Sequence, residues 1–180
     1  MKKQSTRRAT KTSSKEDIIQ LILADHKPLK KLIKIMKDVD NKSLNERRTA
    51  FSEFAPLLMA HANPEEFALY AELKTNSEDM RLEGTEGELE HGLADQLIEE
   101  TKSTQDATLW SARAKILAEM VEHHIEEEEG EMLPEFKKKS VLEVRIELGK
   151  KYLERQKQLQ EAPDHRIAPK KQNLSEHFHS

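Results

Sequence analysis

Apolar residues recur every three or four positions along most of this chain, which is the period of an amphipathic α-helix. The clearest such stripe consists of Ile22, His26, Leu29, Ile33 and Met36. It predicts a first helix that begins at the capping pair Ser14 and Asp17 and runs to about residue 40. A histidine therefore occupies a position where the pattern requires an apolar side chain.

Similar stripes, each preceded by a start signal, predict four more helices. They begin at Ser43, at Thr85, near Asp106 and at Ser140, and the last runs to about residue 161. Residues 74–84 are polar and interrupted by Gly84, so we expect a loop between the second and third helices. The pattern thus predicts an all-α protein with one domain at residues 16–136 and a C-terminal helix at 140–161 that packs on the domain or extends it.

The composition agrees with a helical protein whose outer faces are charged. Of the 180 residues, 36% are hydrophobic, 36% are charged and 4% are aromatic, and only 5 are glycine. The absence of cysteine excludes disulfides, thiolate metal sites and cysteine nucleophiles. No apolar run reaches the roughly 18 residues of a membrane span, and the first residues lack the apolar segment of a secretory signal. We therefore expect a cytoplasmic protein without a membrane partner.

Charge is distributed unevenly along the chain. The whole chain has a net charge of −4, but the first 15 residues hold six basic side chains and no acidic one, which leaves −10 on the remainder. Residues 1–15 are too polar to fold by themselves and are predicted to form a basic tail, and residues 162–180 a second tail. An acidic body argues against nucleic-acid binding, except through the basic tail, for which a solvated segment is the alternative.

Four histidines occur at matched intervals within the helical stripes. His26, His61, His91 and His124 are separated by 35, 30 and 33 residues, or about one helix and one loop each time. Antiparallel helices with that spacing would bring the four imidazoles to a common level. Glu65 and Glu128 follow two of the histidines by four residues, which places each pair on one helical face.

These six residues predict a metal site. A single histidine on an apolar face is more often a hydrogen-bonded core residue, but burying two carboxylates is costly unless a cation compensates them. Imidazoles argue against Mg²⁺ and Ca²⁺, and two carboxylates on different helices can bridge a pair of transition-metal ions. The alternative is an interaction bundle in which the histidines are structural.

Three features carry a resemblance to a known family. The run from His124 to Pro134, the pattern of His61, Glu65 and Glu66 before Leu69-Tyr70, and single histidines at 26 and 91 closely resemble hemerythrin-like (HHE cation-binding) proteins over about residues 16–136. The surroundings of His91 and the fifth helix look like a bacterial subgroup. The resemblance implies an up-down antiparallel four-helix bundle that holds an oxo- or hydroxo-bridged pair of non-heme iron ions. The ligands it implies, with both glutamates bridging, are His26, His61, Glu65, His91, His124 and Glu128.

Members of this family carry or sense O₂, react with NO or peroxide, or serve in iron homeostasis and iron–sulfur cluster repair. We expect a di-iron protein that meets O₂, NO or peroxide in a sensing or protective role. The alternatives are a di-iron enzyme, either a peroxide-disproportionating enzyme or an oxidase, and an iron donor for cluster repair. The sequence leaves open whether the chain is an enzyme and whether manganese or zinc replaces iron.

Two positions depart from the family's oxygen carriers. Asp95 stands where the carriers have a second histidine on the third helix. As a ligand it would stabilise Fe(III) and favour redox or peroxide chemistry; alternatively it accepts a hydrogen bond from a ligand imidazole or is solvated. Pro64 lies between His61 and Glu65, where we expect a kink that re-aims Glu65. If the helix instead restarts at Asn63, Glu66 becomes the replacement ligand.

Gly84 and Gly87 precede His91 on the same helical face. Because neither residue carries a side chain, the two are a candidate access path for a ligand. Loop flexibility near a helix start is the alternative.

Overall fold

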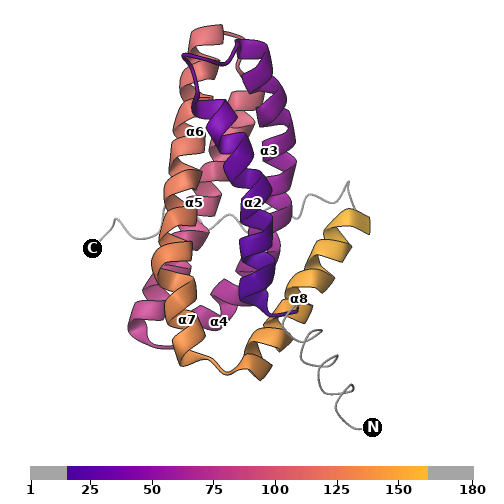
Figure 1. Ribbon diagram of the computed structural model, residues 1–180, viewed down its shortest axis with the longest axis vertical. Coiled ribbons are helices and arrows are strands. Elements are labelled where there is room, and N and C mark those ends of the chain that lie inside the picture. Colours follow the sequence, from indigo (N-terminus) through magenta and orange to yellow (C-terminus); the bar gives the residue numbers. More distant parts are fainter. Residues whose placement is uncertain (1–15, 162–180) are drawn as a thin grey trace, which may run out of the picture.

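A computed structural model describes residues 16–161, so the tails predicted at 1–15 and 162–180 lie outside the described residues. Within the described range the chain is helical and has no strand, which confirms the all-α prediction. Four long helices alternate in direction and form the bundle (Figure 1). They are α2 (Ile18–Lys37), α3 (Leu44–Glu65), α5 (Glu78–Ser103) and α6 (Ala107–Glu127).

The second and fourth helices of the bundle do not stop at their last α-helical residue. Each continues through a single π-helical turn into a shorter α-helix. The turns are η1 (Glu66–Tyr70) and η2 (Glu128–Met132), and the short helices are α4 (Ala71–Leu73) and α7 (Leu133–Lys139). A final helix, α8 (Leu142–Glu161), packs against the lower part of α2 and α3 (Figure 1).

Two of the predicted helix starts are found as expected. Glu46 N–H donates to Ser43 Oγ (3.3 Å) and the Glu46 carboxylate accepts from Ser43 N–H (2.9 Å), which is a complete capping box for α3. The side chain of Asp106 accepts from Leu109 N–H (2.7 Å) and caps α6.

The other predicted starts are shifted. The cap of α2 is Asp17, and Ser14 lies outside the described residues. The predicted start of the third helix at Thr85 is wrong, because α5 begins eight residues earlier, after Ser77. Thr85 lies inside α5 and donates its hydroxyl to the backbone carbonyl of Arg81 (2.7 Å). The segment before it is helical because Met80 is buried and the missing side chain of Gly84 lets α5 approach α4 closely.

The apolar core is divided into two clusters. One surrounds Phe54, Trp110 and Leu117, and the other surrounds Leu69 and Tyr152. Along α2 and α5 the chain passes from one cluster to the other at a buried histidine, and on the second and fourth helices of the bundle the second cluster begins in the π-helical turns that follow His61 and His124. The polar residues thus form a layer between two apolar regions, which hold them in place. Among the described residues, no helix is both long and apolar enough to cross a membrane.

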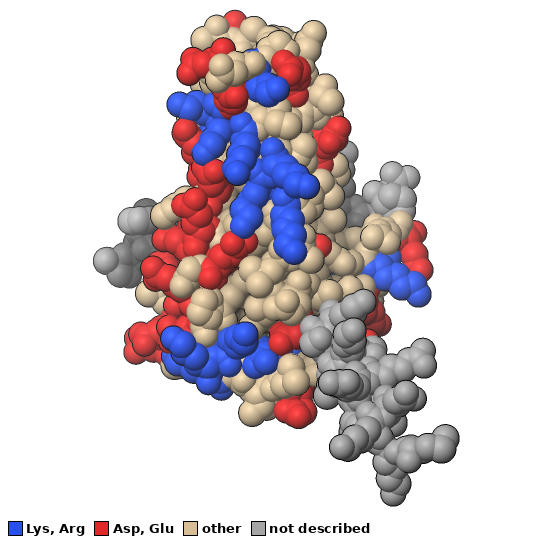
Figure 2. All heavy atoms as spheres, in the orientation of Figure 1, with Lys and Arg blue, Asp and Glu red and all other residues tan. Residues whose placement is uncertain are grey.

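Basic side chains gather over α2 with acidic ones beside them (Figure 2). Two lysines of α2 form ion pairs with the fourth helix and its extension: Lys30 with Glu129 (2.7 Å) and Lys37 with Glu122. Such partly exposed pairs contribute about 0–1 kcal/mol each. They therefore hold the register of α2 rather than provide much stability.

Helix α8 is attached to the bundle by contacts that leave little freedom. Arg145 Nε donates to Asp17 Oδ2 (3.0 Å), and this ion pair is buried. A Cβ atom at Gly149 would lie 1.8 Å from the backbone oxygen of Glu16, so only glycine permits this crossing. The hydroxyl of the buried Tyr152 donates to Asp25 on α2 (2.6 Å). The fifth helix is consequently part of the folded body.

Candidate metal centre

The π-helical turns occur at the two His-x-x-x-Glu sequences. Glu65 is the last residue of α3 before η1, and Glu128 is the first residue of η2. Single π-helical turns change the register of a helix and are common at functional sites. Here they alter the helical register directly after the motif that supplies a histidine and a glutamate to the interior.

Pro64 does not break the helix. Residue Asn63 lies inside α3, and its side-chain oxygen accepts from Arg155 Nε (2.7 Å) instead of capping a new helix. The predicted alternative of a restart at Asn63 is therefore wrong. The backbone N–H of Glu66 donates to the carbonyls of Ala62 and Asn63, which carries the chain past the proline.

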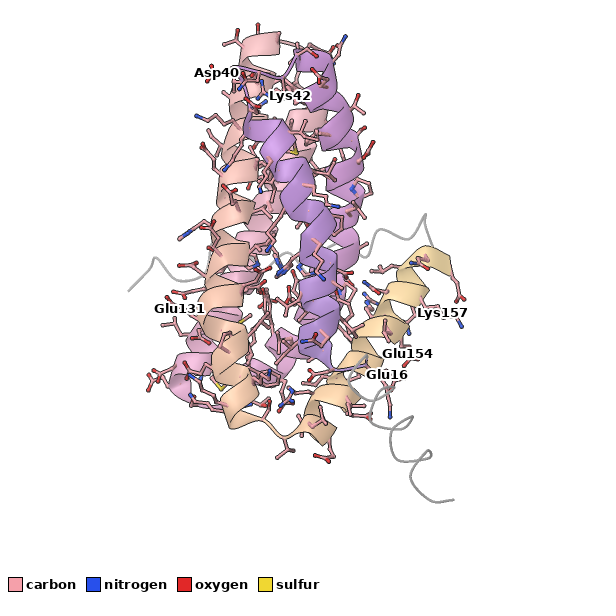
Figure 3. All side chains as sticks on the ribbon, in the orientation of Figure 1. Glu16, Asp40, Lys42, Glu131, Glu154 and Lys157 are labelled. Carbon is pink, nitrogen blue, oxygen red and sulfur yellow. The ribbon has the colours of Figure 1, made fainter. Side chains whose placement is uncertain are left out.

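The four histidines lie close together inside the protein. Side-chain nitrogen and oxygen atoms gather between the helices in the middle of the bundle (Figure 3). The histidines form two neighbouring pairs. The rings of His26 and His61 have centroids 4.9 Å apart, and His91 Nε2 lies 3.1 Å from His124 Nε2. All four side chains are at most 5% exposed. The spacing along the sequence thus brings the imidazoles to one level.

Each glutamate reaches both histidine pairs. Glu65 Oε2 lies 3.3 Å from His61 Nε2 and 3.9 Å from His91 Nε2. Glu128 places Oε2 3.2 Å from His26 Nε2 and Oε1 3.6 Å from His124 Nε2. This is the disposition expected of two carboxylates that bridge two cations.

Among the described residues, five polar atoms at the centre have no hydrogen-bond partner. Neither oxygen of Glu65 has a partner, nor do Glu128 Oε2, His26 Nε2 and His61 Nε2. Leaving buried carboxylates and imidazoles unpaired is costly, and a cation would compensate them. Groups of three potential ligand atoms from this cluster lie within 4.8 Å of one another. The donor set and its unmet bonding capacity therefore fit a metal.

Hydrogen bonds on the outer side orient the imidazoles. His26 Nδ1 lies 3.0 Å from Glu129, His91 Nδ1 3.0 Å from Glu66 and His124 Nδ1 2.6 Å from Glu90. An ionised carboxylate only accepts, so Nδ1 of these three histidines carries a proton, and Nε2 of each neutral imidazole would be the nitrogen available to a metal ion. His61 Nδ1 instead contacts the Tyr152 hydroxyl at 3.1 Å.

These outer partners differ from the sequence interpretation in two respects. Glu66, the candidate replacement ligand, lies behind His91 and belongs to none of the potential metal-binding groups of the described residues. Glu129, one residue after Glu128, contacts both His26 and Lys30. Glu90 and Tyr152 were not identified at all, because neither lies at a fixed spacing from the histidine that it contacts.

Asp95 is half-buried and is likewise absent from the potential metal-binding groups of the described chain. Burial, and then the nearby charge of Glu66, raise its pKa to about 6. The structure therefore gives no support to a ligand role for Asp95, or to the redox preference inferred from it.

The two central glutamates have pKa values shifted in opposite directions. Burial, followed by the charge of Glu128, raises the pKa of Glu65 well above its ordinary value. Burial alone would also raise the pKa of Glu128, but the neighbouring His124 and His26 outweigh it and lower that pKa. Burial and the adjacent His26 depress the pKa of His61. Without a metal, the site therefore favours a proton on Glu65.

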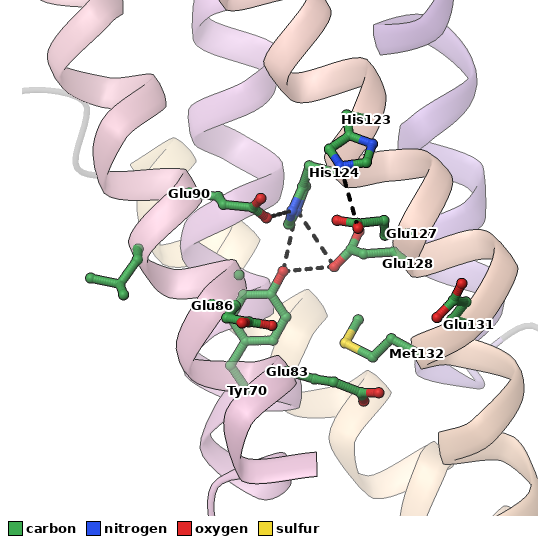
Figure 4. A pocket seen from close by; sticks show the side chains of 12 residues that line it. Tyr70, Glu83, Glu86, Glu90, His123, His124, Glu127, Glu128, Glu131 and Met132 are labelled. Atoms are coloured by element: carbon green, nitrogen blue, oxygen red, sulfur yellow. Dashed lines mark hydrogen bonds and ion pairs between the residues drawn. The ribbon is translucent and has the colours of Figure 1, made fainter. Parts of the chain in front are cut away.

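A cavity of about 400 Å³ between α5 and the end of the fourth helix leads to the histidine cluster (Figure 4). Tyr70, His124 and Glu128 form its inner end, where the Tyr70 hydroxyl donates to Glu128 Oε1 (2.6 Å) and lies 3.3 Å from His124 Nε2. Its outer walls carry glutamates at positions 83, 86, 90, 127 and 131.

The two glycines of α5 have different neighbours. Gly87 lines the cavity and makes room for Tyr70, since a Cβ atom there would lie 2.6 Å from the tyrosine ring. Gly84 does not line the cavity and packs against Leu73. Only Gly87 of the two lies on a path by which a ligand could reach the cluster.

Four antiparallel helices that enclose four buried histidines and two buried glutamates define a cation-binding helical-bundle protein. The family model of the hemerythrin HHE cation-binding domain matches residues 17–136, most of the chain, and the chain belongs to this family. The match ends before α8 begins. Comparison with curated proteins and with solved structures gave no match.

Proposed function

We propose that this protein holds two non-heme iron ions, bridged by Glu65 and Glu128, and that it binds or reacts with O₂, NO or peroxide in a sensing or protective role. The observation that supports the proposal most is the pair of buried carboxylates, each reaching both imidazole pairs. Three of their four oxygens accept no hydrogen bond from a described residue. His26 and His61 would hold one ion, and His91 and His124 the other.

The donor set is compatible with iron. Imidazole nitrogens and carboxylate oxygens without thiolates are borderline and hard ligands, which suit iron, and also manganese or zinc. Bound iron would supply the ability to exchange electrons with a small ligand. Four imidazoles and two carboxylates provide fewer donor atoms than two six-coordinate ions require, so positions remain for such a ligand.

The surroundings favour a small ligand. The cavity reaches His124 of the His91–His124 pair, whereas Tyr152 of α8 packs behind His61. At the inner end of the cavity, the Tyr70 hydroxyl is a hydrogen-bond donor directed at the centre. A diatomic molecule or peroxide could accept this hydrogen bond in place of Glu128. The apolar clusters on both sides of the site would leave little room for a larger group.

The test is metal analysis of protein purified without air, followed by optical titration with O₂, NO and H₂O₂. We expect metal-dependent bands that change with at least one ligand and that are lost in His124→Ala. The matched control is His123→Ala, because His123 is the exposed neighbour of His124 and pairs with Glu127. Equal spectra for both variants would contradict the proposed site.

Peroxide disproportionation is the second candidate, and the position of Tyr70 favours it. The reaction converts two H₂O₂ into O₂ and two H₂O, which requires a group that donates and recovers a proton near the substrate. The Tyr70 hydroxyl is suitably placed at the end of the cavity. Oxygen evolution by the iron-loaded protein that falls strongly in Tyr70→Phe would support an enzyme, and no evolution above free iron would exclude it.

A further inference from the structure

We infer that Tyr152 of α8 is a positioning residue for His61: together with Asp25 it fixes the imidazole tautomer whose Nε2 faces the metal centre. The inference rests on the proposed metal site, since it concerns how one of its ligands is oriented. It assigns a role in the site to a helix that lies outside the matched hemerythrin domain.

The directions of the hydrogen bonds determine the tautomer. The Tyr152 hydroxyl has one proton and donates it to Asp25 Oδ2 at 2.6 Å. The same oxygen lies 3.1 Å from His61 Nδ1, so it can only accept there, and Nδ1 must carry the proton. His61 Nε2 is then unprotonated and directed at Glu65 Oε2, 3.3 Å away. Because the Asp25 carboxylate only accepts, it fixes the direction of the Tyr152 hydroxyl, and the hydroxyl in turn fixes which nitrogen of His61 carries the proton.

This arrangement replaces the direct contact that the other histidines have. His26, His91 and His124 each place Nδ1 against a carboxylate, from Glu129, Glu66 and Glu90. A phenol alone would not select a tautomer, because its hydroxyl both donates and accepts. Asp25 determines that the Tyr152 hydroxyl accepts from His61, so His61 carries its proton on Nδ1 as the other three histidines do.

Other contacts of α8 hold the hydrogen-bond chain from Asp25 through Tyr152 to His61 in place. Tyr152 is fully buried, and Gln156 Nε2 donates to Asp25 Oδ2 (2.8 Å), so the carboxylate is held from α8 as well. Arg155, directly before Gln156, donates from Nε to Asn63 Oδ1 on α3 (2.7 Å). The helix therefore supports both ends of the hydrogen-bond chain.

The two proposed metal positions consequently differ. The position formed by His26 and His61 is backed by α8, whereas that formed by His91 and His124 is reached by the cavity. Loss of the Tyr152 hydroxyl should affect the first position more than the second.

The first arm of the test examines the full chain without metal. Nitrogen-15 NMR of the histidine rings distinguishes a proton on Nδ1 from one on Nε2. In the wild type we expect His61 to be protonated on Nδ1, and in Tyr152→Phe we expect a mixture of tautomers. The control is Arg155→Ala, which removes a neighbouring contact of α8 and leaves the hydroxyl in place. An unchanged His61 tautomer in Tyr152→Phe overturns the inference.

The second arm measures binding of Zn²⁺, a diamagnetic probe, in competition with a chelator. Loss of a group that orients a metal ligand typically lowers affinity about 10- to 100-fold. We expect a loss of this size for one of two bound ions in Tyr152→Phe and near wild-type binding in Arg155→Ala. Equal losses in both variants would mean that α8 acts through packing alone and would overturn the inference.

The two proposals fail in different ways. A wild-type chain that binds no metal refutes the proposed function, and the NMR arm then still decides whether Tyr152 sets the tautomer of His61. A wild-type chain that binds two ions, with Tyr152→Phe indistinguishable in both arms, leaves the metal site intact and refutes the role of Tyr152.

Discussion

Glu65→Gln should change the pH dependence of the stability of the metal-free protein. Glu65 is fully buried, neither of its oxygens has a hydrogen-bond partner, and its pKa is raised well above the ordinary 4.5 by burial and by Glu128. The folded chain therefore retains a proton that the unfolded chain releases. This contribution to stability is fully present below the unfolded pKa and is lost as the pH rises towards the folded pKa.

The size of the effect follows from this linkage. One proton bound only in the folded state costs up to about 1.4 kcal/mol of stability per pH unit. Between pH 5 and 7 the wild type should thus lose up to about 2.7 kcal/mol relative to Glu65→Gln. At about 2–4 °C per kcal/mol for a chain of this size, the difference in melting temperature should widen by up to about 5–11 °C.

The assay is thermal unfolding of chelator-treated protein at several pH values, with Glu53→Gln as the control at an exposed position of the same helix. Adding metal should reverse the order: at 100 times its dissociation constant it stabilises the wild type by about 2.7 kcal/mol, and the variant much less. A difference between wild type and Glu65→Gln that does not vary with pH would refute the reasoning. Equal stabilisation of both by metal would do so as well.

Three further predictions follow from the cavity and the burial of the centre. Tyr70→Phe removes the donor to Glu128 and should lower reactivity with peroxide or NO while metal content is retained, as measured by stopped-flow absorbance against metal analysis. Gly87→Ala should destabilise the protein by about 1–3 kcal/mol because the new Cβ meets the Tyr70 ring, whereas Gly92→Ala, with open space around it, should stabilise it by about 0.5–1 kcal/mol in denaturant titrations. Bound metal should pass to a chelator over hours rather than seconds, because the ligands are at most 5% exposed; rapid release would favour iron donation instead.

The fold and the cluster of four histidines and two glutamates could be predicted from the sequence, because both depend on regular spacing. A period of three to four residues determines which face of a helix is buried, and an interval of one helix and one loop sets the level of His26, His61, His91 and His124. The i, i+4 relation then places Glu65 and Glu128 on the same faces as their histidines. Local backbone geometry alone predicts these relations.

The outer contacts could not be predicted in this way. Glu90 on α5 contacts His124 on α6, and Tyr152 lies 91 positions from His61 in the sequence. No short-range sequence pattern connects the residues of either pair. The start of α5 was misplaced because polar residues after Ser77 resemble a loop unless the burial of Met80 against neighbouring helices is known. Asp95 was considered as a ligand because of its position in the sequence. Its half-buried location outside the potential metal-binding groups of the described residues depends on how the helices pack.

Mössbauer spectroscopy combined with metal analysis can decide whether Glu65 and Glu128 bridge two iron ions. Protein should be produced with ⁵⁷Fe, purified without air and then oxidised. We expect two iron ions per chain whose spins couple to a diamagnetic ground state. One uncoupled iron, zinc alone or no metal would contradict it.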